Sequence, residues 1–277
     1  MFLSDYRTIK GRLFVKTLKQ LVKKIPIIND WTILLYQKLW TKQKLSTTYW
    51  IDKITENVDF KVVQIGSNDG QINDPLSGII KRNSKWEVLF VEPVSYLFDK
   101  LQTSYPKKPR FRFENAFIND GSEQVFYWVK KEAIESLPEL PIWYDQLGSL
   151  DKEHIIKHLK NFVEIEKLHP FIVEDTIQGM TMYELFQKYK IAQLYLLHID
   201  TEGADWKILS QLDLTKYTPL IILFEHRHLQ NAERESAISF LKNIYYIFQF
   251  AGDFLCVRKK GNNMSIGDLI GLRISEH

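Results

Sequence analysis

The sequence predicts one α/β domain built on a mostly parallel β-sheet whose last strand is antiparallel. Short apolar runs rich in Val, Ile, Leu and Phe alternate with stretches of helical periodicity, a pattern typical of parallel strands joined by helices. The chain then closes with two apolar runs on either side of Ala251-Gly252-Asp253, which predicts a hairpin and so an antiparallel last strand. With 277 residues, 45% of them hydrophobic, the chain is long enough for one such domain with a large core.

The first half of the domain is expected to follow this alternation from the first strand onward. The expected elements are strand Lys61–Ile65, a helix at Asp74–Lys81, strand Val88–Val91, helix Ser95–Ser104 and strand Phe111–Ile118. We expect Gln124–Val129 to pair with that third strand as a hairpin around the Asp120-Gly121 turn.

Residues 131–170 break the alternation and are expected to form a lid-like insertion. Its one regular element should be a short helix, Asp151–Leu159, with Ser149 or Asp151 as the N-cap residue. The alternation then resumes, with helix Thr181–Tyr189, strand Leu194–Asp200, helix Ala204–Leu212, strand Leu220–Phe224 and helix Ala232–Ile244.

Residues 1–50 differ in character from the rest. They carry ten Lys and Arg against two Asp, a net charge of +8, which leaves −5 for residues 51–277. The segment is expected to form basic amphipathic helices, which either lie on an anionic membrane surface or dock on the domain or a partner. The domain organisation expected is therefore a helical extension (1–50), a core (51–260) and a C-terminal tail (261–277).

The compartment expected is the cytoplasm, with peripheral membrane contact possible through residues 1–45. The sole cysteine, Cys256, lies in an apolar run and allows no disulfide within the chain, which fits a reducing compartment. Neither a secretory signal nor an apolar run long enough to span a bilayer is apparent.

A glycine-bounded turn after the first strand indicates a nucleoside-containing cofactor. The turn, Gly66-Ser67-Asn68-Asp69-Gly70, lets backbone N–H groups approach a ligand, and Glu92 ends the next strand, where a carboxylate can bind both ribose hydroxyls. Asn68 replaces the middle glycine that a dinucleotide needs, and Asp69 disfavours a pyrophosphate. An acid in this place suits a cationic ligand such as S-adenosylmethionine. No P-loop motif is present.

These residues resemble the FkbM-type S-adenosylmethionine-dependent methyltransferases. The resemblance covers residues 60–260 and is carried by blocks in this order: Gln64–Gly70, Asn73-Asp74-Pro75, Val91-Glu92-Pro93, Glu114-Asn115-Ala116, Asp145–Ser149 and His198–Asp205. It implies a Rossmann-like class I methyltransferase sheet and transfer of a methyl group to an oxygen, commonly a hydroxyl of a sugar, glycan or natural product.

The resemblance also implies a set of cofactor-binding residues. Gly66, Ser67 and Gly70 would cradle the methionine end and Asp69 would hold its amino group. Glu92 would bind the ribose, and Asn115 and Ala116 would border the adenine. Gln64, Asn68, Pro93 and Asp200 complete the set. Each residue has a structural alternative, since the glycines could serve only the turn.

Four residues at the ends of the fourth and fifth strands are the candidates for the chemistry: Asp200, Glu202, Glu225 and His226. His226 is the first choice as general base because of its intrinsic pKa, and Asp200 is the second. Asp200 and Glu225 could instead hold Mg²⁺, and the sequence does not decide between a metal and a simple base. His198, in a buried strand, is interpreted as structural.

The insertion supplies candidate contacts to cofactor or substrate, namely Tyr144, Asp145, Gln146 and Ser149. An ordered structural loop is the alternative.

Two functions from different classes follow from these observations. The first is an O-methyltransferase for a sugar, glycan or related acceptor. The second is a non-catalytic protein of the same fold that binds a membrane or partner through its basic N-terminal helices. No nucleic-acid partner is expected; the acceptor and the oligomeric state stay open.

Overall fold

A computed structural model describes residues 46–56 and 59–276 of the chain. The chain divides into two compact units, Met1–Lys44 and Leu45–His277, and the second is described here by itself. The basic segment expected to form amphipathic helices lies outside the described residues.

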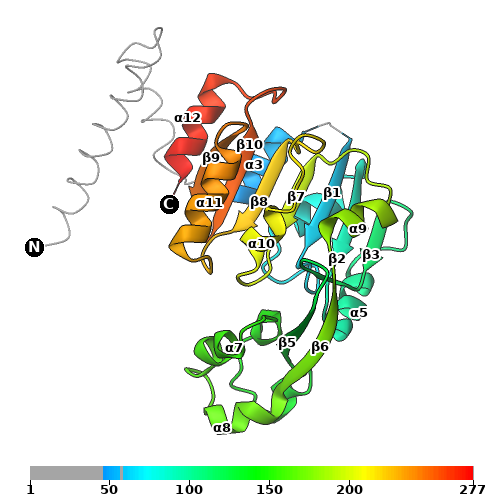
Figure 1. The fold of residues 1–277 in the computed structure, drawn as a ribbon, viewed down its shortest axis with the longest axis vertical. Helices are drawn as coiled ribbons and strands as arrows, with labels where there is room; N and C mark the ends of the chain where they lie inside the picture. Colours follow the sequence, from blue (N-terminus) through cyan, green and yellow to red (C-terminus); the bar gives the residue numbers. More distant parts are fainter. Residues whose placement is uncertain (1–45, 57–58, 277) are drawn as a thin grey trace, which may run out of the picture. The chain divides into compact units, whose positions relative to one another are not determined.

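The unit is organised around a seven-stranded sheet with the order β3-β2-β1-β7-β8-β10-β9 (Figure 1). Its strands are β1 (Phe60–Ile65), β2 (Trp86–Val91), β3 (Phe111–Glu114), β7 (Leu196–Ile199), β8 (Ile221–Glu225), β9 (Tyr245–Phe250) and β10 (Asp253–Arg258). Strands β1, β2, β3, β7 and β8 pair in parallel, and β10 is antiparallel to both β8 and β9. The predicted fold class, a mostly parallel sheet with an antiparallel last strand, is confirmed.

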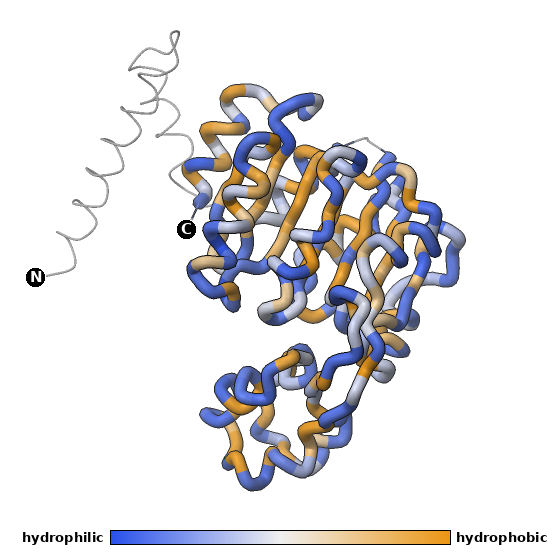
Figure 2. The backbone as a smooth tube through the Cα atoms, in the orientation of Figure 1, coloured by the Kyte–Doolittle hydropathy of each residue, from blue (hydrophilic) through white to orange (hydrophobic). Residues whose placement is uncertain are grey.

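Helices are packed on this sheet. They are α3 (Thr47–Ile54), α4 (Ser77–Arg82), α5 (Ser95–Ser104), α9 (Met182–Lys188), α10 (Asp205–Leu209), α11 (Asn231–Leu241) and α12 (Ile266–Ser275). Apolar side chains of α9, α10 and α11 form one buried cluster with every second residue of the central strands, such as Val63 and Ile65 of β1. The strands are accordingly the most apolar part of the backbone (Figure 2). This core fixes the strand ends at one edge of the sheet.

Two helices extend the unit beyond the limits expected for the core: α3 spans position 50, and α12 lies wholly after position 260. Trp50 of α3 is fully buried and its indole Nε1–H donates to Ser275 Oγ of α12 at 3.2 Å. Residues on both sides of position 50, and most of the segment expected to be a tail, therefore pack in the same unit.

Residues 117–180 form a separate lobe, green in Figure 1. A three-stranded sheet, β4 (Phe117–Ile118), β6 (Ile172–Met180) and β5 (Glu123–Val129), leads to α6 (Ala133–Ser136), η1 (Tyr144–Gln146), α7 (Lys152–Leu159), α8 (Ile165–Leu168) and η2 (His169–Phe171). The lobe has its own apolar core, to which Ile155 and Leu159 of α7 contribute. Asp151 caps α7, as expected, by accepting from Glu153 N–H.

The expected hairpin of the third strand with Gln124–Val129 is wrong. The third strand ends at Glu114, and β5 pairs instead with β6 in antiparallel register over seven residues, from Glu123 opposite Gln178 to Val129 opposite Ile172. Strand β6 was not predicted, because only the first of its nine residues is buried and it lacks the apolar run of a core strand.

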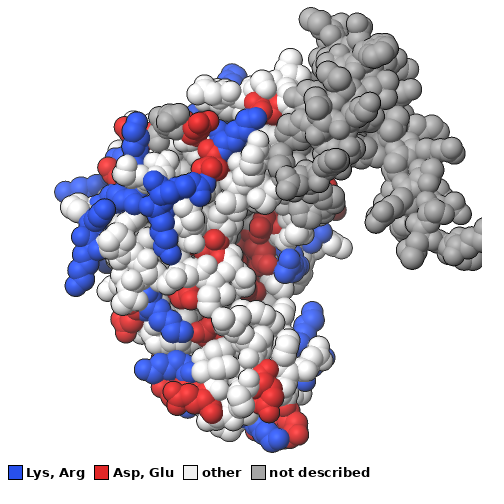
Figure 3. Space-filling model, turned by 180° about the vertical axis from the view of Figure 1, so that it is seen from behind, with Lys and Arg blue, Asp and Glu red and all other residues white. Residues whose placement is uncertain are grey.

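Charged side chains of both signs are mixed over the surface seen from behind (Figure 3). Lys and Arg gather at the upper left of this view, and the lobe below carries both signs. Within residues 46–56 and 59–276, no helix has the length and apolar character needed to cross a membrane.

Candidate active site

The glycine turn after β1 is held against the end of β7. Gly66 has φ +78°, and a Cβ added to it would lie 1.7 Å from the carbonyl oxygen of Asp200. The N–H groups of Gly66 and Ser67 both donate to Val91 O of β2, at 3.0 Å. Because neither the backbone conformation nor the space admits a side chain, glycine at position 66 brings the ends of three strands together.

Glu92 lies at the centre of this arrangement with only 4% of its surface exposed. Its two carboxylate oxygens accept hydrogen bonds from Asn68 N–H at 2.8 Å and Val94 N–H at 2.9 Å. Burial raises the pKa of Glu92 to about 7, although both hydrogen bonds oppose the shift. Asn115 fixes the loop after Glu92, since its side-chain amide donates to Glu92 O at 2.7 Å and Pro93 O at 3.0 Å.

Two narrow cavities flank the turn. Gly66, Asn68, Gln146, Asp200 and Glu202 line both. The first is otherwise largely apolar and adds Glu92, Pro93, Val94, Leu97, Ala116 and Phe117. The second is polar and adds Gln64, Ser67, Asn73, Asp74 and His198. The structure therefore brings together most of the predicted cofactor-binding residues.

Three of the predicted cofactor residues are not among those that line the two cavities. The carboxylate of Asp69 accepts from Gln71 N–H and Ile72 N–H, at 2.9 and 3.0 Å, and so stabilises the turn itself. At Gly70 a Cβ would lie 2.7 Å from the side chains of Leu101 and Tyr105, so this glycine permits close packing of α5. The Asn115 side chain donates to the carbonyl oxygens of Glu92 and Pro93, and so it holds the loop after β2 in place.

The residues around the polar cavity fit the cationic ligand expected there. Gln64 Oε1, Asn68 Oδ1 and Asp74 Oδ2 are buried acceptors with no hydrogen-bond partner among residues 46–56 and 59–276. Buried acceptors without a donor are costly, and an ammonium or hydroxyl group of a ligand supplies donors. Asp74, which lies in one of the blocks of the resemblance but was not expected to bind the cofactor, is thus better placed than Asp69 to meet an ammonium group.

The turn after β7 presents Glu202 to the cavities. Asp205 is buried and accepts from Thr201 Oγ1 at 3.1 Å and from Gly203 N–H at 3.3 Å, which holds the turn in shape. Glu202 itself has φ +53°, in the left-handed region that non-glycine residues rarely adopt. Such strain at a cavity wall commonly marks a functional position.

Four carboxylates crowd this edge of the sheet. Burial, together with the negative charges of its neighbours, raises the pKa of Asp200 well above its ordinary value. For the same reasons the pKa of Glu225 rises to about 10 and that of Asp205 to about 7. Asp200, Glu202 and Glu225 are therefore brought together as predicted, in a region that favours protons or cations.

His226 does not join them. Its ring is 3% exposed, lies 4.2 Å from that of Phe254, and is in neither cavity. Burial lowers its pKa. His226 follows the last residue of β8, and its ring packs against Phe254, which belongs to the same apolar cluster as Val63 and Ile65. His198 borders the polar cavity, and burial lowers its pKa to about 4, which keeps it neutral at neutral pH.

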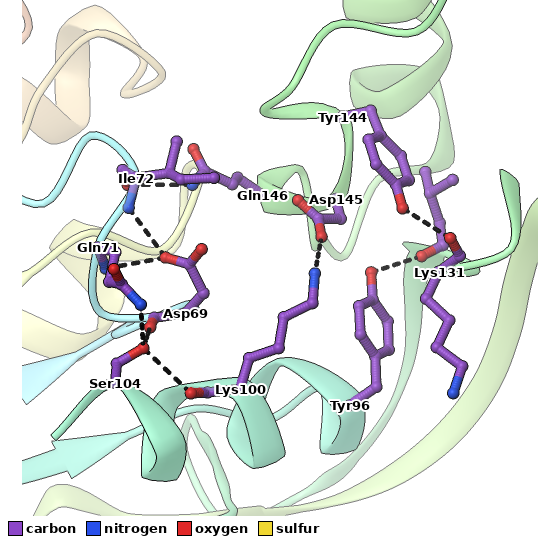
Figure 4. A network of polar contacts seen from close by, with 11 residues as sticks. Asp69, Gln71, Ile72, Tyr96, Lys100, Ser104, Lys131, Tyr144, Asp145 and Gln146 are labelled. Atoms are coloured by element: carbon purple, nitrogen blue, oxygen red, sulfur yellow. Dashed lines mark hydrogen bonds and ion pairs between the residues drawn. The ribbon is translucent and has the colours of Figure 1, made fainter. Parts of the chain in front are cut away.

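The lobe is bonded to the turn through η1 (Figure 4). Gln146 Nε2–H donates to Ile72 O at 3.0 Å, and Asp145 pairs with Lys100 of α5 at 2.9 Å. Tyr144 is buried in the lobe core and donates to Lys131 O at 2.8 Å, so it has a structural place. Ser149 reaches a third, larger cavity between the lobe and the sheet.

Comparison with known proteins now decides the family. A sequence model of the methyltransferase FkbM domain matches residues 64–255, more than half of the chain. The chain belongs to the FkbM methyltransferase family. No curated protein matches it. Among solved structures, the crystal structure of a fibrillarin/Nop5p complex is similar at 11% identity and a TM-score of 0.37, with 77% of this chain and 81% of that chain covered.

This FkbM methyltransferase has a histidine cluster that was not predicted. His154 and His158 of α7 and His228 after β8 form it, with ring nitrogens within 4.8 Å of one another. His154, His228 and Glu202 line the third cavity, which measures about 740 Å³. The spacing of His154 and His158, four residues apart on a predicted helix, was a visible signal. Their meeting with His228 depends on how the lobe packs on the sheet, which no local pattern reveals.

Proposed function

We propose that this chain is an S-adenosylmethionine-dependent O-methyltransferase that modifies a hydroxyl of a sugar, glycan or related polyhydroxy acceptor. The observation that carries the proposal is the junction of the cavities at Thr201 and Glu202. Both residues line the apolar cofactor cavity and the large third cavity, so a methyl donor in one would face an acceptor in the other.

The cofactor half rests on residues of the sheet. Glu92 has lone pairs left for ribose hydroxyls after accepting its two backbone bonds. Val94, Leu97, Ala116 and Phe117 would enclose the adenine, and Asp74 with Gln64 would receive the methionine ammonium group. When bound, S-adenosylmethionine would supply a methyl group carried on a positively charged sulfonium, which suits an edge rich in carboxylates.

The acceptor half favours a polar molecule. Most residues that line the third cavity are charged or polar: Ser149, Asp151, Glu153, His154, Lys157, Lys160, Lys207, Arg227, His228, Gln230 and Glu233, besides Glu202. Many hydrogen-bonding groups around a cavity of this size suit a molecule with several hydroxyls, whereas a lining without such groups would suit a lipid chain.

Asp200 is the group we assign as proton acceptor for the reacting hydroxyl. It lines both cofactor cavities beside Glu202, and its raised pKa makes the carboxylate a stronger base than an exposed aspartate. Asp200→Asn should therefore lower turnover at saturating S-adenosylmethionine by about 100-fold or more. Asp213→Asn, on an exposed loop after α10, is the matched control.

The proposal is tested in two steps. Titration calorimetry should detect S-adenosylmethionine binding at sub-millimolar concentration, and absence of binding would refute the enzyme. A panel of free sugars and oligosaccharides is then incubated with cofactor labelled with ¹³C in its methyl group. NMR of the product should place the label on oxygen; a label on nitrogen or carbon would contradict the O-methyltransferase.

A further inference from the structure

The histidine cluster lies where the lobe meets the sheet, and its rings are close together. Ring centroids are 4.4 Å apart for His154 and His158, and 4.8 Å apart for His154 and His228. The ring nitrogens that could serve as ligands all lie within 4.8 Å of one another. Imidazole is the commonest metal ligand in proteins, and three imidazoles hold the zinc ion of some catalytic sites.

Carboxylates complete the set. His154 Nε2 lies 3.0 Å and His228 Nε2 3.3 Å from the same oxygen of Glu202, and His228 Nε2 lies 3.5 Å from Glu225 Oε1. Two ligands bonded at about 2.1 Å to one ion in tetrahedral or octahedral geometry lie about 3.0 to 3.4 Å apart. The spacing of these donor atoms is thus close to that around a single ion.

Two further observations point to an ion rather than to hydrogen bonds alone. His158 Nδ1 lies 2.8 Å from its own helix's His154 O, which fixes the proton on Nδ1 and leaves Nε2 as a bare lone pair. In addition, Glu225 Oε2 is buried without a hydrogen-bond partner in the part of the chain that the structure describes. Each of these two atoms offers a lone pair that a cation can accept, and His228 belongs to both groups of residues that could hold an ion.

We propose that one divalent transition-metal ion binds beside the third cavity. Its ligands are His154, His158, His228 and Glu202, with Glu225 beside them. Imidazole nitrogen with carboxylate oxygen suits Zn²⁺, Fe²⁺, Co²⁺ or Mn²⁺, whereas an all-oxygen set would suit Mg²⁺. This site differs from a Mg²⁺ site made by Asp200 and Glu225, because histidine supplies most of its ligands.

The ion would have two consequences. It would join α7 of the lobe to the ends of β7 and β8, so the two halves of the active site would be tied by metal bonds. It would also offer open coordination positions to an acceptor hydroxyl in the same cavity. The second consequence rests on the proposed function; the binding of the ion does not.

Binding is tested on the full chain after chelator treatment and dialysis, without cofactor or acceptor. Co²⁺ should bind at one ion per chain and give visible absorption bands with imidazole and carboxylate ligands. His158→Ala and His228→Ala, one on the lobe and one on the sheet, should each weaken binding about tenfold or more. His169→Ala, an exposed histidine of the same lobe, should bind as the wild type does.

The outcomes separate this proposal from the previous one. If the wild-type chain takes up no Co²⁺ or Zn²⁺ at millimolar concentration, or if both variants bind as the wild type does, the cluster is only a hydrogen-bonded joint and the site is refuted. Circular dichroism of each variant checks that the fold is kept. The visible Co²⁺ spectrum of the wild-type chain tests the site even if a variant fails to fold. If the metal-free chain binds S-adenosylmethionine and transfers methyl at the full rate, the ion's role toward the acceptor is refuted while the proposed function stands.

Discussion

The sheet and the lobe are built differently, and each supplies half of the candidate site. Every residue of β7 and β8 is buried, whereas only one of the nine residues of β6 is. The sheet holds Gly66, Glu92 and Asp200 on strand ends fixed by a large core. The lobe, with a smaller core of its own, contributes the side chains that close over them. We infer that the sheet sets the position of the cofactor. The lobe then controls which acceptor reaches it.

The largest effect is expected in the sheet, from Gly66→Ala. The methyl group would meet the backbone of Asp200, and φ +78° strains any side chain, so we expect a loss of about 3 kcal/mol or more in the free energy of unfolding. Chemical denaturation measures it. Gly78→Ala, in α4 with only an ordinary contact to Arg82, should be neutral or stabilising; equal losses for both variants would contradict the argument.

The second test concerns the cofactor alone. Glu92→Gln removes a charged acceptor that two backbone N–H groups and the ribose would share, so S-adenosylmethionine affinity should fall about 10- to 100-fold. Calorimetry measures the dissociation constant. Glu87→Gln, exposed on the same strand, is the control. Unchanged affinity in Glu92→Gln would mean that the cofactor does not contact this carboxylate.

The third test is the dependence of stability on pH. Because the pKa of Glu92 is about 7 in the folded chain and 4.5 when unperturbed, its contribution to stability is fully present below pH 4.5 and is lost as pH rises through 7. Between pH 5 and 7 this amounts to about 2 kcal/mol, so the Tm of the wild type should fall by about 4 to 8 °C more than that of Glu92→Gln. Parallel curves in differential scanning calorimetry would contradict the raised pKa.

The smallest effect is expected at the contact between the two regions. Gln146→Ala removes one bond to Ile72 O and one from Asn73, worth about 0.5 to 1.5 kcal/mol each, and so should weaken cofactor affinity about 3- to 10-fold. Stopped-flow fluorescence should show a faster dissociation rate. Gln124→Ala, on β5 and away from the turn, should not change it. If Gln146→Ala binds more tightly, the contact excludes the cofactor rather than retaining it.

The same contrast explains what the sequence could predict. The strands of the sheet were found because strands buried on both faces are continuous apolar runs, and Gly66, Glu92 and Asp200 met because parallel strand ends share an edge. Strand β6 was not predicted because its residues are mostly polar and exposed or half-buried, so it has no apolar run. His226 was expected at the site, but it follows the end of β8 and its ring packs against Phe254 of the core. His154 and His228 are 74 positions apart, so only the packing of the lobe joins them.

The left-handed backbone of Glu202 has one more consequence. A glycine adopts φ +53° readily, so Glu202→Gly relieves backbone strain while it loses the contacts with His154 and His228 and the carboxylate that all three cavities share. These two effects on folding oppose each other, whereas the site loses a carboxylate outright. We therefore expect activity to fall far more than stability at this one position.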